Sequence, residues 1–178
     1  MSRLVLLGTA YFAPIQYYSK LLNADKVYIE QFENFIKQTY RNRCVVLGGN
    51  GVIQLIVPVV KGRGPKILIK DLKISYDTDW QRNHWRSIFS AYSSSPFFEY
   101  YKDDIHLFFE TKHKFLLDFN LKIQETICEL LEIENNAVLT SDFEKVPEGT
   151  ANLRERISPK IKTQSDNDFQ PVKYTQVF

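Results

Sequence analysis

The chain has 178 residues, a formal net charge of +2 and an aromatic content of 14%. This length predicts one domain, or one domain with a short appendage. The nearly balanced charge gives no indication of a nucleic acid or a membrane surface as partner. Two cysteines exclude a disulfide framework, no signal peptide is visible, and no apolar run approaches the roughly 18 residues that span a bilayer, so we expect a cytoplasmic protein without a membrane span.

Residues 4–31 predict a parallel β–α–β unit. An apolar run at residues 4–9 indicates a buried strand, residues 14–23 carry apolar side chains at helical spacing, and residues 26–31 indicate a second strand. Ligands of such units bind where the first strand ends. We therefore expect a site beside the aromatic turn at Tyr11.

Residues 44–57 predict a β-hairpin, because two β-rich runs flank the turn sequence Gly48-Gly49-Asn50-Gly51. Two short apolar runs, at residues 67–69 and 72–74, predict one further strand with a bend.

The following stretch predicts helices. One is expected from Trp80 to Tyr92, ending at the serine–proline break that follows. A longer helix is expected between about residues 105 and 131, where apolar side chains recur at three- and four-residue steps. Residues 137–140 predict a last strand.

Together these elements predict an α/β fold with a parallel β–α–β start, an inserted β-hairpin and a mixed sheet covered by helices at 79–133. We expect a single domain at residues 1–150. Residues 151–178 are basic and polar, and we expect this C-terminal segment to be partly mobile. It ends in the apolar Tyr174–Phe178, which indicates a protein partner or self-association.

Familiar catalytic motifs are not evident. The glycines at 48–51 lie in a hairpin and precede no helix, so they predict a turn and not a phosphate loop. The three histidines, at positions 84, 106 and 113, lack the i, i+4 spacing of a helical zinc site. The sequence therefore predicts no metal site and identifies no cofactor.

A basic stretch follows the second predicted strand. Its side chains Gln38, Arg41, Asn42 and Arg43 lie at the same edge as the first turn if the two strands are parallel. Two guanidinium groups and amides can hold a phosphate or a carboxylate there. The alternative is a solvated loop before the hairpin.

A second cluster lies on the first predicted helix of the 79–133 region. Trp80 and His84 are four residues apart and share one face, and Tyr92 follows on the same helix. This pattern fits either an indole packed on a core histidine or a stacking wall beside a group that transfers protons.

Several short motifs follow one another along nearly the whole chain. They are an aromatic–proline turn with a tyrosine-rich helix, an Ala-Asp pair before a strand, a Phe-x-x-Gln and Arg-Asn-Arg stretch, a Trp-x-x-x-His helix and an Ile-Ser-Pro-Lys segment, at residues 11–18, 24–29, 35–43, 80–84 and 157–160. In this order they resemble the WbqC-like proteins of bacterial gene clusters for O-antigen and related surface polysaccharides. The Leu-Arg and Tyr-x-Gln-Val-Phe endings are similar to the branch found in Bacteroidetes.

The resemblance implies a cell-surface polysaccharide pathway and a transferase-type enzyme that acts on a small-molecule substrate, a nucleotide-activated or amino sugar. It implies no mechanism. On this hypothesis Arg41 and Arg43 bind phosphates, Gln38 and Asn42 orient the sugar or acyl group, and His84 is the general acid or base. The full set of expected substrate-binding residues is Tyr11, Gln38, Arg41, Asn42, Arg43, Trp80 and Lys160.

Relatives of this branch continue past the Gln-Val-Phe ending into an apolar helix with a Leu-x-x-x-Asp-Leu-Leu pattern. The present sequence ends at Phe178. We therefore expect the C-terminal segment to be cut short relative to the family.

Two alternatives stay open. The first is a nucleotidyltransferase-like enzyme, in which the turn at Tyr11–Tyr18 holds a nucleotide and the loop at Ile157–Lys160 stabilises its phosphates, although Ile15–Tyr18 lacks the histidines that such enzymes use. The second is a non-enzymatic scaffold or binding module, which the aromatic excess and the apolar ending at Tyr174–Phe178 favour.

Overall fold

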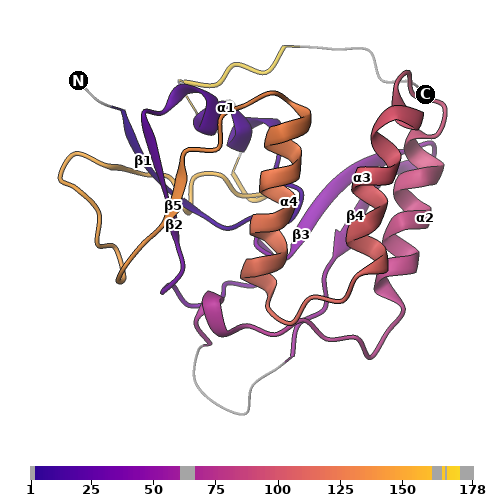
Figure 1. Cartoon of the computed structure of the whole chain (residues 1–178), viewed down its shortest axis with the longest axis horizontal. Coiled ribbons are helices and arrows are strands. Elements are labelled where there is room, and N and C mark those ends of the chain that lie inside the picture. The colour runs from indigo at the N-terminus through magenta and orange to yellow at the C-terminus, as the bar shows by residue number, and fades with distance from the viewer. Residues whose placement is uncertain (1–2, 61–66, 162–165, 167, 173–178) are drawn as a thin grey trace.

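The computed structural model describes residues 3–60, 67–161, 166 and 168–172 (Figure 1). Within them, four parallel strands form a sheet in the order β5-β2-β1-β6, with β1 at Leu4–Gly8, β2 at Lys26–Glu30, β5 at Ala137–Leu139 and β6 at Ala151–Asn152. Strands β3 (Arg43–Gly48) and β4 (Gly51–Ile56) form a separate antiparallel hairpin. The α/β class, the parallel start and the inserted hairpin are confirmed, and the expected mixed arrangement takes the form of a parallel sheet plus this hairpin.

The β–α–β unit has the predicted order, with α1 (Ile15–Asn23) between β1 and β2. The register runs from Leu4 opposite Lys26 to Gly8 opposite Glu30. Alternate residues of both strands face one side of the sheet, where Tyr17, Tyr18 and Leu21 of α1 cover them. This packing explains why the helical spacing in residues 14–23 was a sufficient signal for α1.

The single long helix predicted for residues 105–131 is wrong. The chain forms α3 (Phe98–Glu110) and α4 (Leu116–Leu130), separated by an extended stretch. In that stretch the Lys114 carbonyl accepts from the Ile74 N–H at 3.1 Å, and the Leu116 N–H donates to the Leu72 carbonyl at 2.9 Å. These backbone groups therefore bond a neighbouring segment and cannot continue a helix. The helix expected at Trp80–Tyr92 is present as α2 with these bounds.

The bent strand predicted at residues 67–74 is also wrong. The centre of this stretch is a short 3₁₀-helix, η1 (Ile69–Asp71), flanked by single β-bridges from Leu68 to Asn34 and from Ile74 to Val59. Its apolar side chains are buried in the core, which accounts for the strand-like pattern.

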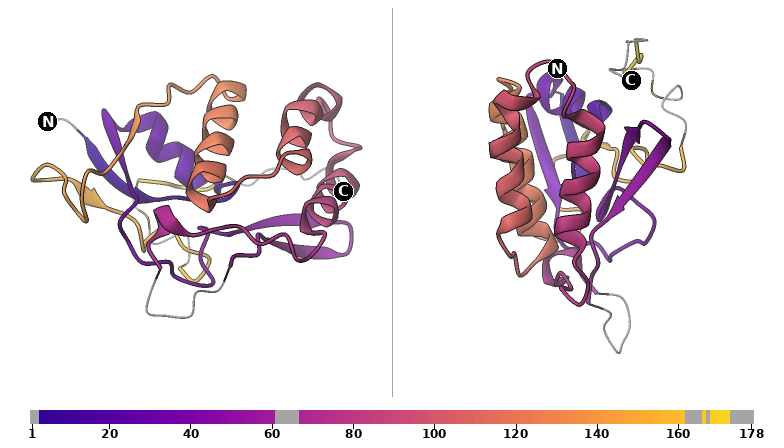
Figure 2. Two further views of the ribbon diagram at one scale, coloured as in Figure 1. Left: turned by 60° about the horizontal axis from the view of Figure 1, so that its bottom comes forward. Right: turned by 90° about the vertical axis from the view of Figure 1, so that its right-hand side faces the viewer.

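Two hydrophobic cores lie side by side and share α4. One joins the hairpin to α2, α3 and α4, and the other joins the parallel sheet to α1 and α4. Figure 2 shows the hairpin beneath α2 and α3 on one side, and the sheet with α1 and α4 on the other. Because Leu116 and Phe119 face the first core and Leu117 and Cys128 the second, α4 holds the two halves together.

The expected boundary at residue 150 lies directly before β6. β6 pairs in parallel with β1, the Leu153 N–H donates to the Leu6 carbonyl at 2.9 Å, and Ile157 is 8% exposed. Residues 151–157 thus pack as part of the sheet. The predicted contact segment Tyr174–Phe178 lies outside the described residues. Among those that are described, no helix combines the length and apolar character needed to cross a membrane.

Candidate functional site

Charged side chains from several separate stretches meet where the parallel strands end. β1, β2, β5 and β6 run in the same direction, so their carboxyl ends lie at one edge of the sheet. Ligands of open α/β sheets bind at this edge. We define the carboxyl-edge cluster by the ionisable side chains that gather there: Glu30, Glu33, Arg41, Glu144, Arg154 and Glu155.

Arg41 and Glu33 form a buried bidentate ion pair at the centre of this cluster. The Arg41 Nε and Nη2 atoms lie 2.6 and 2.7 Å from Glu33 Oε1 and Oε2, and the two residues are 3% and 4% exposed. Nη2 also lies 3.1 Å from Glu155 Oε1. Burial lowers the pKa of Arg41, but the interactions with Glu33 outweigh it and raise the pKa overall, so the guanidinium stays charged. Its Nε and Nη2 atoms are therefore already occupied by carboxylates of the same chain.

Arg154 is the second cation of the cluster. Its Nη1 lies 3.7 Å from Glu33 Oε2 and 4.0 Å from Glu30 Oε2, and its Nη2 pairs with Glu144. The guanidinium carbon lies 5.3 Å from the ring centroid of Phe143, within the range of a cation–π contact. Since the cluster contains two arginines and four glutamates, its formal charge is −2.

Glu30 joins the end of β2 to the end of β5. It is fully buried, and its carboxylate accepts hydrogen bonds from the Thr140 hydroxyl at 2.9 Å and from the N–H groups of Phe32 and Glu144, each at 2.8 Å. A buried carboxylate is stable only when it is paired in this way. Glu30 therefore fixes the geometry of the strand ends on which the site is built.

Only Arg41 of this cluster is among the residues predicted from the sequence. A signal for Glu30 exists, because it directly follows the apolar Val27–Ile29 at the ligand-binding end of a parallel strand. Arg154 and Glu155 carry no such signal, since the two-residue strand β6 that positions them is too short for any period.

Gly8, at the end of β1, leaves room for the Arg41–Glu33 pair. A Cβ atom at this position would lie 3.1 Å from Glu33 Oε1 and 3.2 Å from Arg41 Nη2, closer than ordinary contacts. We expect Gly8→Ala to lower the free energy of unfolding by about 1–3 kcal/mol, because the paired groups cannot move apart freely. Denaturant titration measures this change.

Gly49→Ala is the matched control, since nothing lies within 4 Å of its added Cβ, and we expect a change within about 0.5 kcal/mol. Equal changes in the free energy of unfolding for the two substitutions would show that the Arg41–Glu33 pair can move aside for the added Cβ without loss of stability.

Two cavities open beside the cluster. The larger, of about 410 Å³, is lined by Glu33, Asn34, Phe35, Ile36, Phe143, Arg154 and Glu155. The smaller, of about 10 Å³, lies between residues 7–10, Arg41, Arg154 and Ile157 and has the size of one water molecule. We call the larger one the carboxyl-edge pocket. It combines two phenylalanine rings with charged groups, a composition typical of small-molecule sites.

The predicted residues Tyr11, Trp80 and His84 lie together in the aromatic core. The Tyr11 hydroxyl oxygen lies 2.9 Å from His84 Nδ1, and the Trp80 and His84 rings meet edge-on with centroids 5.1 Å apart. Burial lowers the pKa of His84 to about 4, against an opposing hydrogen bond with the Ile56 backbone, so the imidazole is neutral at pH 7. His84 is only 6% exposed and lines neither cavity beside the carboxyl-edge cluster, whereas Arg41 lines the smaller one.

The other predicted residues are spread over the core and the surface. Asn42 Nδ2 donates to the Val57 carbonyl at 2.9 Å, and this bond ties the two ends of the hairpin together. The Nε of Arg43 is buried and has no hydrogen-bond partner among the described residues. Gln38 and Lys160 are exposed. The structure thus separates the basic stretch into a buried ion-paired Arg41, a structural Asn42 and a solvent-facing Gln38.

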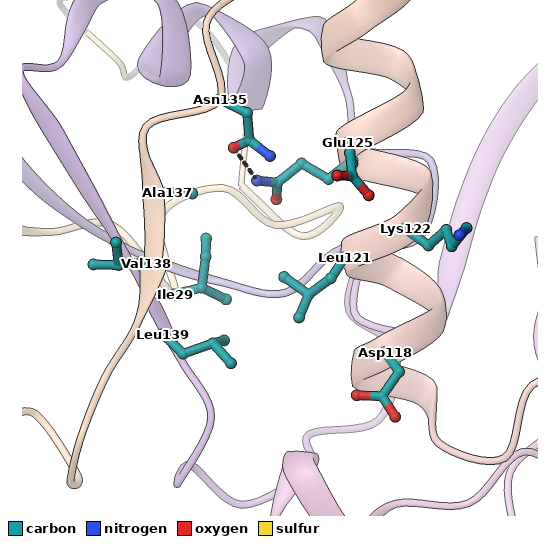
Figure 3. Close-up of a pocket in the computed structure, with 10 residues that line it drawn as sticks. Ile29, Asp118, Leu121, Lys122, Glu125, Asn135, Ala137, Val138 and Leu139 are labelled. Carbon is teal, nitrogen blue, oxygen red and sulfur yellow. Dashed lines mark hydrogen bonds between the residues drawn. The ribbon is translucent and has the colours of Figure 1, made fainter.

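A further pocket of about 410 Å³ lies between α4 and β5 (Figure 3). Apolar side chains such as Ile29 and Leu121 point into it, Gln124 and Asn135 are hydrogen-bonded to each other at 3.1 Å, and Lys122 points away from β5. Its lining runs along the whole of β5 and one side of α4, not along the carboxyl edge of the sheet, so it is a weaker candidate than the carboxyl-edge pocket.

Neither metal nor thiol chemistry is indicated by the part of the chain that the structure describes. In that part, no group of three or more His, Cys, Asp or Glu side chains is arranged to hold a metal ion. Cys44 and Cys128 are buried, and burial raises the pKa of the Cys44 thiol to about 12. A thiolate nucleophile at either position is therefore not expected.

Comparisons with known proteins identify the family. A model of the WbqC-like protein family matches residues 9–167. An uncharacterised protein of Mycobacterium tuberculosis, Rv1507c, is 27% identical over 146 residues, which cover 81% of this chain and 62% of that relative, so the chain spans less than two thirds of the relative's length. No solved structure matches significantly. Because the family match extends over most of its length, the chain belongs to the WbqC-like protein family.

Proposed function

We propose that this protein is a transferase-type enzyme that acts on a nucleotide-activated or amino sugar in a bacterial cell-surface polysaccharide pathway. The observation that carries the proposal is the carboxyl-edge pocket, where charged and aromatic side chains meet at the ligand-binding edge of a parallel sheet. The pathway and the Bacteroidetes-type branch are supported by the motif resemblance alone. We place the reaction in the cytoplasm, where nucleotide-activated sugars are made.

The chemistry of the pocket favours the sugar part of such a substrate. Carboxylates accept hydrogen bonds from hydroxyl and ammonium groups, and Glu155, which is 62% exposed, has acceptor capacity beyond its bond to Arg41. The rings of Phe35 and Phe143 offer apolar faces to the C–H side of a sugar ring. Arg154, the cation that lines this pocket, is already paired with glutamates of the same chain, so we assign the sugar and not the phosphates to this pocket.

Calorimetric titration with amino sugars and with UDP-, dTDP-, GDP- and CMP-sugars tests the proposal. We expect Phe143→Ala and Glu155→Gln each to weaken binding by about tenfold, which corresponds to about 1.4 kcal/mol. Phe143 is 52% exposed, so its replacement leaves the fold intact. Glu148→Gln, at an exposed position outside the pocket, is the control and should bind like the wild type.

Absence of binding for every sugar tested would refute the assignment of the ligand class. The catalytic role predicted for His84 is tested in the same series, because a His84→Gln protein with unchanged affinity and unchanged turnover would remove it.

Nucleotidyl transfer is the second candidate. Since β6 pairs with β1, the chain after β6 lies beside the turn after β1, and both line the small cavity through Thr9 and Ile157. In enzymes that form adenylates, the turn after the first strand and a loop late in the chain flank the nucleotide. A structure with bound ATP that contacts both the turn after β1 and Lys160 would favour this reaction, whereas ATP bound away from both would exclude it.

A further inference from the structure

Lys20 is a buried cation that the proposed site does not use. It lies in α1 and is 1% exposed, which is rare for lysine unless the ammonium is paired. Its Nζ lies 3.0 Å from Asp166 Oδ1 and 2.8 Å from Oδ2. Gln16, one turn earlier and 8% exposed, donates its Nε2 to Asp166 Oδ2 at 2.7 Å. Two buried donors of α1 thus converge on one carboxylate.

That carboxylate comes from the far end of the chain, 146 residues from Lys20. In Figure 1 the described part of the C-terminal segment passes beside α1. A second ion pair of the described residues joins Asp168 to Arg3 at 2.8 Å, and the two side chains are 63% and 41% exposed. Exposed pairs contribute little to stability. Among the described residues of this segment, Asp166 therefore makes the main contact with α1.

A cavity of about 530 Å³ adjoins this contact. Apolar residues of β1, β6 and the following turn, such as Val5 and Ile157, form part of its wall, and Gln16, Arg3 and Arg156 also line it. Its volume lies within the range of roughly 300–1,000 Å³ that is usual for small-molecule sites. Among the described residues, Arg3 and Arg156 are the cations that line it, and Lys20 reaches its edge through Asp166. Asp166 pairs with Lys20 and Asp168 with Arg3.

We propose that Lys20 and Gln16 form a binding site for a phosphoryl group, and that Asp166 of the same chain occupies this site in place of the ligand. Release of Asp166 exposes an ammonium and an amide that point to one place, and Lys is a common phosphate ligand. Arg3 and Arg156 line the same cavity and can bind a second phosphoryl group of the ligand, so the ligand class is a diphosphate. The ligand then competes with Asp166 for Lys20 and Gln16. The apparent affinity of the wild type for the ligand equals the intrinsic affinity multiplied by the fraction of molecules in which Asp166 has left the site.

Pyrophosphate binding to the full-length chain tests this proposal by calorimetry and thermal unfolding. We expect Asp166→Asn to bind pyrophosphate about tenfold or more tightly than the wild type, because the competing carboxylate is removed. Its unfolding temperature should be lower than that of the wild type in buffer and should rise more when pyrophosphate is added. In the double variant Asp166→Asn with Lys20→Met, the gain in pyrophosphate affinity and the larger rise in unfolding temperature should both disappear.

Asp168→Asn provides a second variant whose folding is not at risk, since Asp168 is exposed and Lys20 keeps its partner. We expect a smaller gain in pyrophosphate affinity, because only the outer anchor of the segment is lost. Unchanged affinity in both single variants, or a gain that survives Lys20→Met, would overturn the proposal and leave Lys20–Asp166 as a structural ion pair.

Malonate is the comparison ligand, and binding of malonate as tight as that of pyrophosphate would overturn the phosphoryl assignment. None of these measurements depends on sugar binding, so failure of this proposal can be distinguished from failure of the proposed function.

Discussion

Replacing Arg41 by methionine is expected to lower the free energy of unfolding by about 3–5 kcal/mol. The guanidinium and the Glu33 carboxylate are almost completely buried, so the substitution leaves an uncompensated charge inside the protein. Arg154 Nη1, at 3.7 Å from Glu33 Oε2, compensates only in part, because it also faces Glu30 and the same guanidinium pairs with Glu144. Chemical denaturation of wild type and variant at neutral pH measures the loss.

The double variant Arg41→Met with Glu33→Met separates the cost of an orphaned charge from the value of the pair. We expect it to recover most of the stability, since apolar residues of similar volume commonly replace buried ion pairs at little cost. Arg82→Met is the control, because Arg82 pairs with Asp79 on an exposed face and such pairs contribute about 0–1 kcal/mol. An Arg41→Met protein as stable as Arg82→Met would contradict the central role given to this pair.

The second large effect is expected from acid. The pKa of His84 is lowered by burial from its ordinary 6.5 to about 4, so between these two pH values the unfolded chain binds a proton that the folded chain excludes. The free energy of unfolding therefore falls as the pH drops from about 6.5 towards 4 and is independent of this group above that range. A difference of this size corresponds to about 3 kcal/mol.

Unfolding titrations at pH 7.0, 5.5 and 4.5 measure this contribution. In His84→Gln the side chain cannot ionise, so we expect a lower stability at pH 7 from altered packing against Trp80 and Tyr11, but a flatter loss between pH 6.5 and 4. Asn83→Gln, at an exposed position of the same helix and without an ionisable group, is the control and should keep the slope of the wild type. If His84→Gln loses stability with acid as steeply as the wild type, other groups dominate the acid response.

The elements that could be predicted are those whose signal is local. The bounds of α2 follow from the apolar face that starts at Trp80 and from the serine–proline break after Tyr92, and the hairpin follows from the glycine-rich turn at 48–51. The break between α3 and α4 gives no such signal, because Phe109 and Leu116 face adjoining parts of one core and the apolar spacing runs on across it. Only the backbone bonds between residues 114–116 and 72–74 end the first helix and begin the second.

The sequence by itself determined the family, the α/β class and the edge of the sheet at which we propose that a ligand binds. Each depends on the chain order of short motifs and on periods of two and 3.6 residues. Tertiary structure alone decided what the predicted residues do. It turned Arg41 from an expected phosphate ligand into the partner of Glu33 and Glu155, the latter 114 residues away, and it covered Lys20 with Asp166. Ion pairs between such distant residues leave no period in the sequence, since they depend on which strands pair and not on local spacing.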